Sequence, residues 1–204
     1  MLYYKAVAPP TLELLKRLLQ LEVFREMRLV GGTSLALQLG HRKSIDIDLF
    51  GSLETDDLAV SDALKSFRGV TIIQKTENIS IYSIEGIKVD IVNYPYPWLS
   101  DVKVENGIRL AHIEDIAAMK LSAITGRGTK KDFVDISILL RQFSLKQMLE
   151  FYSRKYYDGS EFLVLKSLGY FEDVDPEPDP IMLHKMDWAT IKRGIVTSLK
   201  NYYP

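Results

Sequence analysis

The sequence contains no cysteine, and this absence excludes several kinds of site at once. There is no disulfide framework and no thiolate metal site. Long hydrophobic runs are absent too, since no stretch approaches the roughly 20 apolar residues of a transmembrane helix. The first residues, Met1–Pro10, carry one lysine and two prolines, which is not the pattern of a signal peptide. We therefore expect a cytoplasmic protein with no membrane partner.

The sequence also has almost no net charge. Its 26 Lys and Arg residues and 27 Asp and Glu residues give a formal charge of -1. The protein as a whole therefore has no attraction for nucleic acid, and any contact with RNA needs a local basic patch. The length of 204 residues is enough for one large domain or two small ones.

Hydrophobic periodicity predicts that strands and helices alternate in the first half and that helices fill the second. In the first half we expect helices at 11–27, with Thr11 as N-cap, 33–39 and 55–67, and strands at 29–30, 45–50, 70–75, 79–84 and 88–93. Glu85-Gly86 should form the turn of a hairpin. In the second half we expect helices at 113–124, 130–143, 145–157, 161–168 and from the N-cap Asp187 to about 201, with an acidic, proline-rich loop at 173–180.

This order of elements predicts an α+β fold, with an N-terminal mixed sheet flanked by helices and a C-terminal helical part. The change in character follows two prolines, Pro95 and Pro97. We place the domain boundary so that residues 1–105 form the first domain and residues 106–204 the helical one.

An acidic pair on a predicted strand is the most informative feature of the first half. Asp46 and Asp48 are two residues apart, so their side chains point to the same face. Their mutual repulsion would be relieved by divalent cations, and carboxylate oxygens suit Mg²⁺ or Mn²⁺. Asp90 lies in a later strand that could run beside the first. Three converging carboxylates would suit a two-metal phosphoryl-transfer site.

A glycine pair precedes these acids. Without side chains at Gly31 and Gly32, a triphosphate could approach the backbone, and the following helix would offer its N-terminal amides. Thr33 or Ser34 could add a hydroxyl. Taken alone, a glycine pair usually marks a turn, and an Asp-x-Asp strand is usually a solvated edge. The combination in this order is much less expected by chance.

The segment from Gly32 to Asp48 resembles the signature of the polymerase-beta-like nucleotidyltransferase superfamily. The longer pattern is similar to the AbiEii/AbiGii-type nucleotidyltransferase toxins. It comprises residues 30–37, Gly40-His41-Arg42 and residues 44–50. In the second half, residues 114–120 and Lys131-Asp132 resemble later motifs of that family. The resemblance implies a polymerase-beta-like core at residues 1–105.

The resemblance also implies roles for particular residues. Asp46, Asp48 and Asp90 would be catalytic and hold the metal ions, and Lys120 would serve the nucleotide phosphates. Asp132 would be a further functional acid. The residues predicted to bind the nucleotide are Gly31, Gly32, Thr33, Ser34, Arg42 and Lys120. From the residues alone, Lys120 could equally be a lysine at the edge of an apolar helix, and Arg42 could be a structural partner of an acid.

The implied function is transfer of a nucleoside monophosphate from an NTP to an acceptor hydroxyl. The acceptor would be RNA, such as the 3′ end of a tRNA, or a protein. The protein would be the toxin of a toxin–antitoxin or abortive-infection system, with an antitoxin partner that has a DNA-binding domain. Two alternatives stay open: transfer to a small molecule such as an antibiotic, and a non-catalytic module that binds nucleotide or a partner on the same fold.

Overall fold

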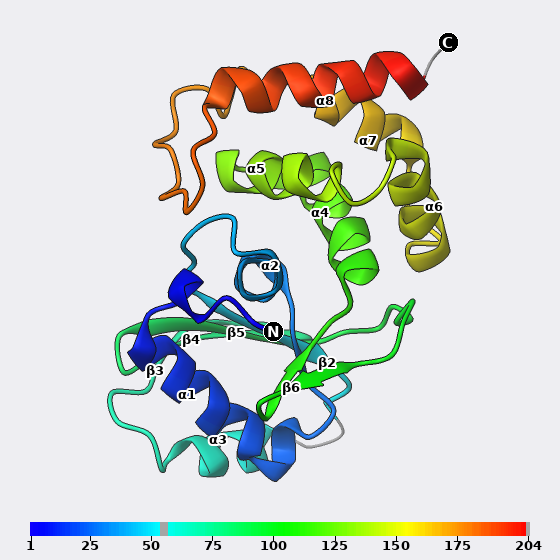
Figure 1. The fold of residues 1–204 in the computed structure, drawn as a ribbon. Coiled ribbons are helices and arrows are strands. Elements are labelled where there is room, and N and C mark those ends of the chain that lie inside the picture. The colour runs from blue at the N-terminus through cyan, green and yellow to red at the C-terminus, as the bar shows by residue number, and fades with distance from the viewer. Residues whose placement is uncertain (54–56, 203–204) are drawn as a thin grey trace. The chain divides into compact units, whose positions relative to one another are not determined.

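The computed structural model of the protein describes residues 1–53 and 57–202, which form two compact units. The first unit consists of Met1–Pro95 and Val102–Ala111, and the second of Tyr96–Asp101 and the chain from His112 onward. The sheet lies in the first unit and helices make up the second (Figure 1), which confirms the predicted α+β class. The sequence predicts a boundary between two domains at residues 105 and 106. The division into compact units does not test that boundary, which stays a prediction.

The sheet of the first unit has seven strands in the order β3-β4-β5-β2-β1-β7-β6. β2 runs parallel to β5 and β1 parallel to β7, and the other neighbouring strands are antiparallel. The strands are β1 (Arg28–Leu29), β2 (Ile47–Gly51), β3 (Thr71–Lys75), β4 (Ile79–Ile84), β5 (Ile87–Asn93), β6 (Lys103–Glu105) and β7 (Ile108–Leu110). The parallel pair in the middle, β2 and β5, carries two of the three acids predicted from the sequence, Asp48 and Asp90.

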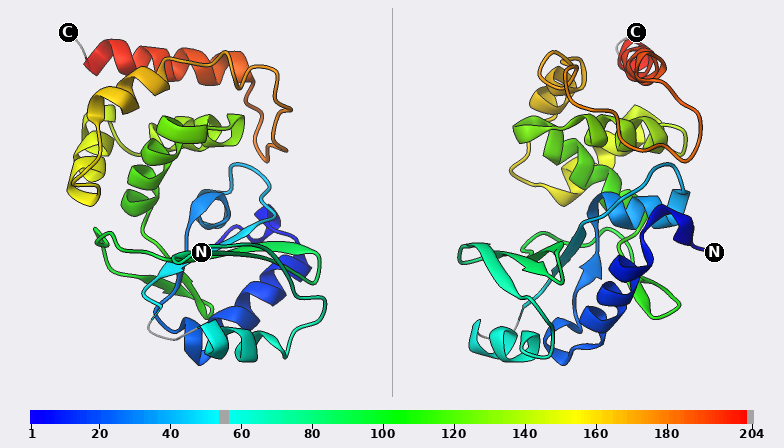
Figure 2. Two further views of the ribbon diagram at one scale, coloured as in Figure 1. Left: turned by 180° about the vertical axis from the view of Figure 1, so that it is seen from behind. Right: turned by 90° about the vertical axis from the view of Figure 1, so that its left-hand side faces the viewer.

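Helix α2 (Gly31–Leu39) covers one face of this sheet, and α1 (Pro9–Gln20) and α3 (Asp57–Leu64) lie on the other (Figure 1 and Figure 2). The N-cap of α1 is Ala8 rather than Thr11, because Pro9 and Pro10 occupy the first turn, where an amide hydrogen is not needed. The helix also ends earlier than predicted, and a 3₁₀ turn, Glu22–Phe24, follows it. The predicted helix at 55–67 begins at residues 55 and 56, which lie outside the described residues.

The second unit contains α4 (Ile113–Arg127), α5 (Lys130–Leu139), α6 (Leu145–Lys155), α7 (Glu161–Leu168) and α8 (Trp188–Tyr202). α4 packs against α5, α6 and α7, and α8 packs against α5, α6 and α7. As predicted, Asp187 caps α8, since its carboxylate accepts a hydrogen bond of 2.7 Å from the amide of Thr190. Within the part of the chain that the structure describes, no helix combines the length and the apolar character needed to cross a membrane.

Candidate active site

Two of the three predicted acids lie directly opposite each other on neighbouring strands. Asp48 on β2 and Asp90 on β5 are paired residues of the parallel ladder, so their side chains leave the same face of the sheet. Asp46 is the residue before β2. Among residues 1–53 and 57–202, no three acidic or histidine side chains are grouped as a metal site. The structure therefore brings Asp48 and Asp90 together without assembling three carboxylates around one point.

Asp90 has one oxygen bound and the other without a partner. Lys88 lies two residues earlier on β5, and its Nζ is 2.7 Å from Oδ2 of Asp90. Oδ1 of Asp90 is buried and has no hydrogen-bond partner. A buried carboxylate oxygen without a partner is costly, and a divalent cation binds such hard oxygen ligands. The donor atoms at Asp48 and Asp90 therefore fit Mg²⁺ or Mn²⁺.

Lys88 was not among the residues predicted for the site. The alternation Lys88-Val89-Asp90 places the lysine and the acid on one face of the strand, and this spacing could have identified it. The ammonium group neutralises Asp90 and thus reduces its repulsion with the neighbouring Asp48.

Gly31 brings the main chain against the carboxylate of Asp48. Gly31 has φ +65, in the left-handed region that favours glycine, and a Cβ atom there would lie 2.2 Å from Oδ2 of Asp48. Gly31 is also the first residue of α2. The first amides of a helix have no partner inside it and suit an anion. A carboxylate and an anion-binding helix end thus meet at one residue.

We expect Gly31→Ala to lower activity through displacement of the Asp48 carboxylate. The positive φ should also cost about 1–2 kcal/mol of folding stability. The matched control is Gly86→Ala, since Gly86 has φ +80 and open space where its Cβ would stand. Urea unfolding should give similar stability losses for the two variants. The predicted nucleotide-transfer activity should fall at least about tenfold, or about 1.4 kcal/mol, only in Gly31→Ala. Equal activities would show that Gly31 does not position Asp48.

The two hydroxyls after the glycines are buried and have partners within the first unit. The hydroxyl of Thr33 donates to the carbonyl oxygen of Asp46 and contacts Oγ of Ser44 at 2.8 Å. Oγ of Ser34 accepts a hydrogen bond of 3.2 Å from Gln38. Thr33 therefore ties α2 to the segment that enters β2. The predicted contact of Thr33 or Ser34 with a phosphate stays a prediction.

Arg42 and His41 are buried in the segment between α2 and β2. Nη1 of Arg42 donates to the carbonyl oxygen of Lys43 at 2.9 Å. The same segment pairs with the N-terminal chain, because the amide of Ser44 donates to the carbonyl oxygen of Ala6. Arg42 thus has a hydrogen-bond partner within its own segment, and its contact with a nucleotide stays a prediction.

In the second unit, Lys120 lies between two carboxylates. Its Nζ is 2.7 Å from Oδ1 of Asp132 and 2.7 Å from Oδ2 of Asp135. Asp135 is fully buried and was not predicted as a site residue, although its spacing of three from Asp132 places both on one helix face. The cluster joins α4 to α5, and it has one more negative than positive charge. Asp132 also closes a capping box with Thr129 at the start of α5.

Asp132 should make the protein sensitive to acid. Burial would raise the pKa of Asp132, but the Lys120 ammonium and hydrogen bonds from Thr129 outweigh it and hold the pKa below the usual value. A carboxyl group with a lowered pKa stabilises the fold above its unfolded pKa, near pH 4, and loses this contribution as pH falls through the folded pKa. The difference in unfolding free energy between the protein and Asp132→Asn should therefore shrink below about pH 4. A difference independent of pH would contradict the ion pair.

The basic residues near the start of α5 do not form an exposed group. Nζ of Lys130 is buried and donates to the carbonyl oxygens of Asp175 and Glu177 and to Oδ1 of Asp179. The acidic, proline-rich loop at 173–180 is thus held over the start of α5. Lys130 is therefore engaged within its own unit, while Lys131 is exposed.

Known proteins resemble this chain in sequence and in fold. The family model described as "Nucleotidyl transferase AbiEii toxin, Type IV TA system" matches residues 13–202. An uncharacterized protein of Aquifex aeolicus (strain VF5) is 34% identical over 171 residues, which are 81% of this chain and 83% of that protein. The crystal structure of JHP933 from Helicobacter pylori has a TM-score of 0.62 at 20% identity, covering 96% of this chain and 92% of that one. MenT4, a nucleotidyltransferase toxin of Mycobacterium tuberculosis H37Rv, has a TM-score of 0.63 at 15% identity, covering 91% and 79%.

Proposed function

This chain belongs to the AbiEii nucleotidyltransferase toxin family, and we propose that it transfers a nucleoside monophosphate from an NTP to a hydroxyl group of RNA. The observation that carries this proposal is the pairing of Asp48 with Asp90 beside Gly31. The helix N-terminus suits the phosphates of a metal-bound triphosphate. The carboxylates suit the metal ion and the deprotonation of the attacking hydroxyl.

Asp46, Asp48 and Asp90 would hold Mg²⁺ or Mn²⁺, and the partnerless Oδ1 of Asp90 supports this assignment. The bound ion would supply charge neutralisation at the phosphates. As they stand, the three carboxylates are not gathered as a metal site, so binding would draw them together. Lys88, which now neutralises Asp90, would then give up its contact with Oδ2.

The side chains and backbone of the first unit would position the reactants. The amides at the start of α2 would receive phosphate oxygens beside Gly31. The carboxylate of Asp90 would also accept the proton of the acceptor hydroxyl, whose oxygen attacks the α-phosphorus in line while pyrophosphate leaves. Such a reaction depends on orientation and electrostatic stabilisation rather than on a covalent intermediate with the protein. The roles of Lys120, Asp132 and Arg42 in nucleotide binding, which the resemblance implies, stay predictions.

The acceptor and the partner are the finer parts of the proposal. We assign the acceptor to RNA, with the 3′ end of a tRNA as the first candidate, as the resemblance to the AbiEii-type toxins implies. The family model describes a toxin of a type IV toxin–antitoxin system. On the same ground we propose an antitoxin protein as the partner and the cytoplasm as the place of action. Near-zero net charge means that RNA binding must depend on local groups.

The test is incubation with each of the four labelled NTPs, Mg²⁺, total RNA and a protein extract, followed by separation of the RNA and protein fractions. Label in RNA that is lost in Asp48→Ala and on addition of EDTA would support the proposal. Label in the protein fraction would refute the RNA acceptor and keep the transferase. Label in neither fraction would refute transfer to RNA and to protein, and it would favour the binding module or transfer to a small molecule.

A further inference from the structure

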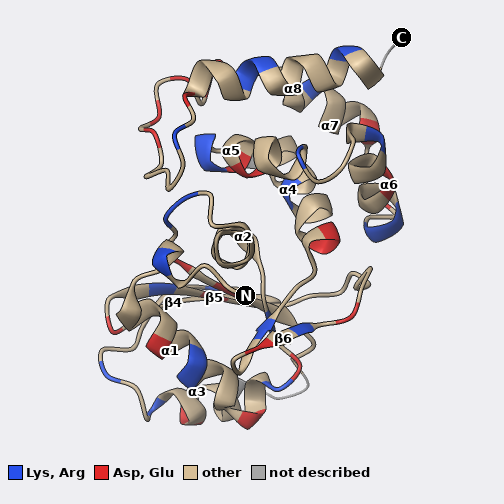
Figure 3. Cartoon of the chain, in the orientation of Figure 1, with Lys and Arg blue, Asp and Glu red and all other residues tan. Residues whose placement is uncertain are grey.

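Lys88 is the basic residue of β5, and its ammonium group is bound to one of the proposed metal ligands. Nζ of Lys88 lies 2.7 Å from Oδ2 of Asp90. Across the ladders, Asp90 is paired with Asp48 on β2 and with Ile81 on β4, so neither of these neighbours brings a positive charge. Basic and acidic positions both occur on the strands of this sheet (Figure 3). The charge that offsets Asp90 therefore comes from its own strand.

The ammonium group and a metal ion would compete for the same carboxylate. Lys88 occupies Oδ2 of Asp90, while Oδ1 is buried and has no hydrogen-bond partner. Both oxygens belong to one carboxylate, so a divalent cation at Oδ1 would lie close to the ammonium at Oδ2, and the two positive charges would repel each other. Metal binding at Asp90 therefore requires that the ammonium group of Lys88 move away.

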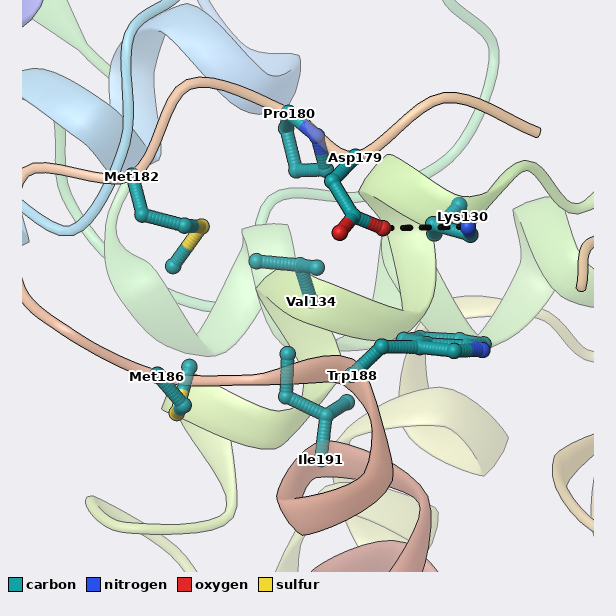
Figure 4. Close-up of a pocket in the computed structure, with 8 residues that line it drawn as sticks. All are labelled: Lys130, Val134, Asp179, Pro180, Met182, Met186, Trp188 and Ile191. Atoms are coloured by element: carbon teal, nitrogen blue, oxygen red, sulfur yellow. Dashed lines mark hydrogen bonds and ion pairs between the residues drawn. The ribbon is translucent and has the colours of Figure 1, made fainter.

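The side chain of Lys88 can leave Asp90 at little cost. It is 42% exposed, and among the described residues Asp90 provides its one hydrogen bond. Lys130 in the second unit shows the opposite case. Its side chain is 5% exposed, and Nζ binds Asp179 (Figure 4) and two carbonyl oxygens. A partly exposed ion pair contributes little to stability, so the contact of Lys88 is one that a ligand can replace.

A bound NTP would give the released ammonium group a new partner. The proposed function puts the phosphates beside Gly31, and Gly31 lies against Asp48, the ladder partner of Asp90. Neighbouring strands are about 4.8 Å apart, and the flexible four-carbon stem of a lysine extends over a similar distance. The ammonium group therefore has an anion within reach when NTP is bound, and the carboxylate of Asp90 when it is not.

We propose that Lys88 is a positioning residue that makes metal binding depend on NTP binding. Without nucleotide its ammonium group holds the place of a cation at Asp90, and with NTP it moves to the phosphates. The metal site is thus weak in the free protein and strong in the NTP complex, and by linkage the metal strengthens NTP binding by the same factor. This inference rests on the proposed metal role of the acids, and it adds a residue and a coupling to it.

The test measures two affinities, neither of which needs activity. Mn²⁺ binding to the protein without nucleotide is followed by electron paramagnetic resonance. Binding of α,β-methylene analogues of the four NTPs, which cannot be cleaved at that bond, is followed by calorimetry with Mn²⁺ present. Lys88→Met should bind Mn²⁺ at least about tenfold more tightly than the unaltered protein, or about 1.4 kcal/mol. It should bind the analogue several fold more weakly. A merely structural role of Lys88 would weaken both.

Two further variants test whether the positive charge is the cause. Lys88→Arg keeps the charge and a donor for Asp90, so its Mn²⁺ affinity without nucleotide should stay as low as that of the unaltered protein. Lys103→Met removes an exposed lysine of β6, at the edge of the sheet, and should change neither affinity.

The outcomes for Lys88 and for the metal site are distinguishable. The proposal is overturned if Lys88→Met binds Mn²⁺ no more tightly than the unaltered protein, if its analogue binding is unchanged, or if Lys88→Arg gains Mn²⁺ affinity. Each of these results leaves the proposed transfer reaction standing. If instead Asp48→Ala binds Mn²⁺ normally, the metal role proposed for Asp48 fails, and the coupling through Lys88 fails with it.

Discussion

Replacing Asp48 by alanine should reduce nucleotide transfer by about a thousandfold or more, equivalent to about 4 kcal/mol of transition-state stabilisation. Asp48 pairs with Asp90 on the neighbouring strand and contacts the backbone at Gly31. Its loss should remove a proposed metal ligand and a group proposed to orient the phosphates. The measurement is the rate of label transfer at saturating NTP, with circular dichroism to show that the sheet is retained.

A second readout separates metal binding from catalysis. Titration with Mn²⁺, followed by electron paramagnetic resonance in the presence of each NTP, should show weakened metal binding in Asp48→Ala. The matched control is Glu13→Gln, because Glu13 is an exposed acid of α1, outside the site. If Asp48→Ala binds Mn²⁺ as the unaltered protein does, the proposed metal role of Asp48 is wrong, whatever happens to the activity.

The two strands that carry these acids could be predicted because they are long enough to show alternation. Residues 45–50 and 88–93 alternate apolar and polar side chains, and the structure has β2 and β5 there. The two short strands, β6 and β7, were missed because three residues are too few for a period of two. Their turn, Asn106-Gly107, has positive φ at both residues and is a hairpin signal that could have revealed them.

The position of Asp48 directly opposite Asp90 could not be predicted from the residues next to either acid in the sequence. About 40 residues separate Asp48 from Asp90, and the register of two strands so far apart depends on which strands pair and on what packs around them. The same limit applies to Lys130, which the sequence places only at the start of a predicted helix. Its burial depends on Asp175, Glu177 and Asp179, which follow it by 45 residues or more.

Replacing Lys155 by methionine should destabilise the second unit by about 3–5 kcal/mol, since it leaves a charged partner buried without its counter-ion. Lys155 and Asp115 are both fully buried, with Nζ 2.7 Å from Oδ1. Nζ also donates to the carbonyl oxygen of Pro97 at 2.8 Å and lies 4.5 Å from the centre of the Trp98 ring. Oδ1 of Asp115 accepts a hydrogen bond from the amide of Leu99. The pair thus fastens residues 97–99 to α4 and α6.

The loss of stability in Lys155→Met should be large because the ion pair is buried. Two further variants test this explanation. Lys192→Met removes a lysine whose pair with Asp175 is partly exposed, so it should cost no more than about 1 kcal/mol. Lys155→Met combined with Asp115→Leu removes both charges, and it should recover most of the stability because no unpaired charge is left. Urea unfolding gives all of these free energies. If Lys155→Met costs no more than Lys192→Met, water reaches the Lys155–Asp115 pair and residues 97–99 are held to α4 and α6 by other contacts.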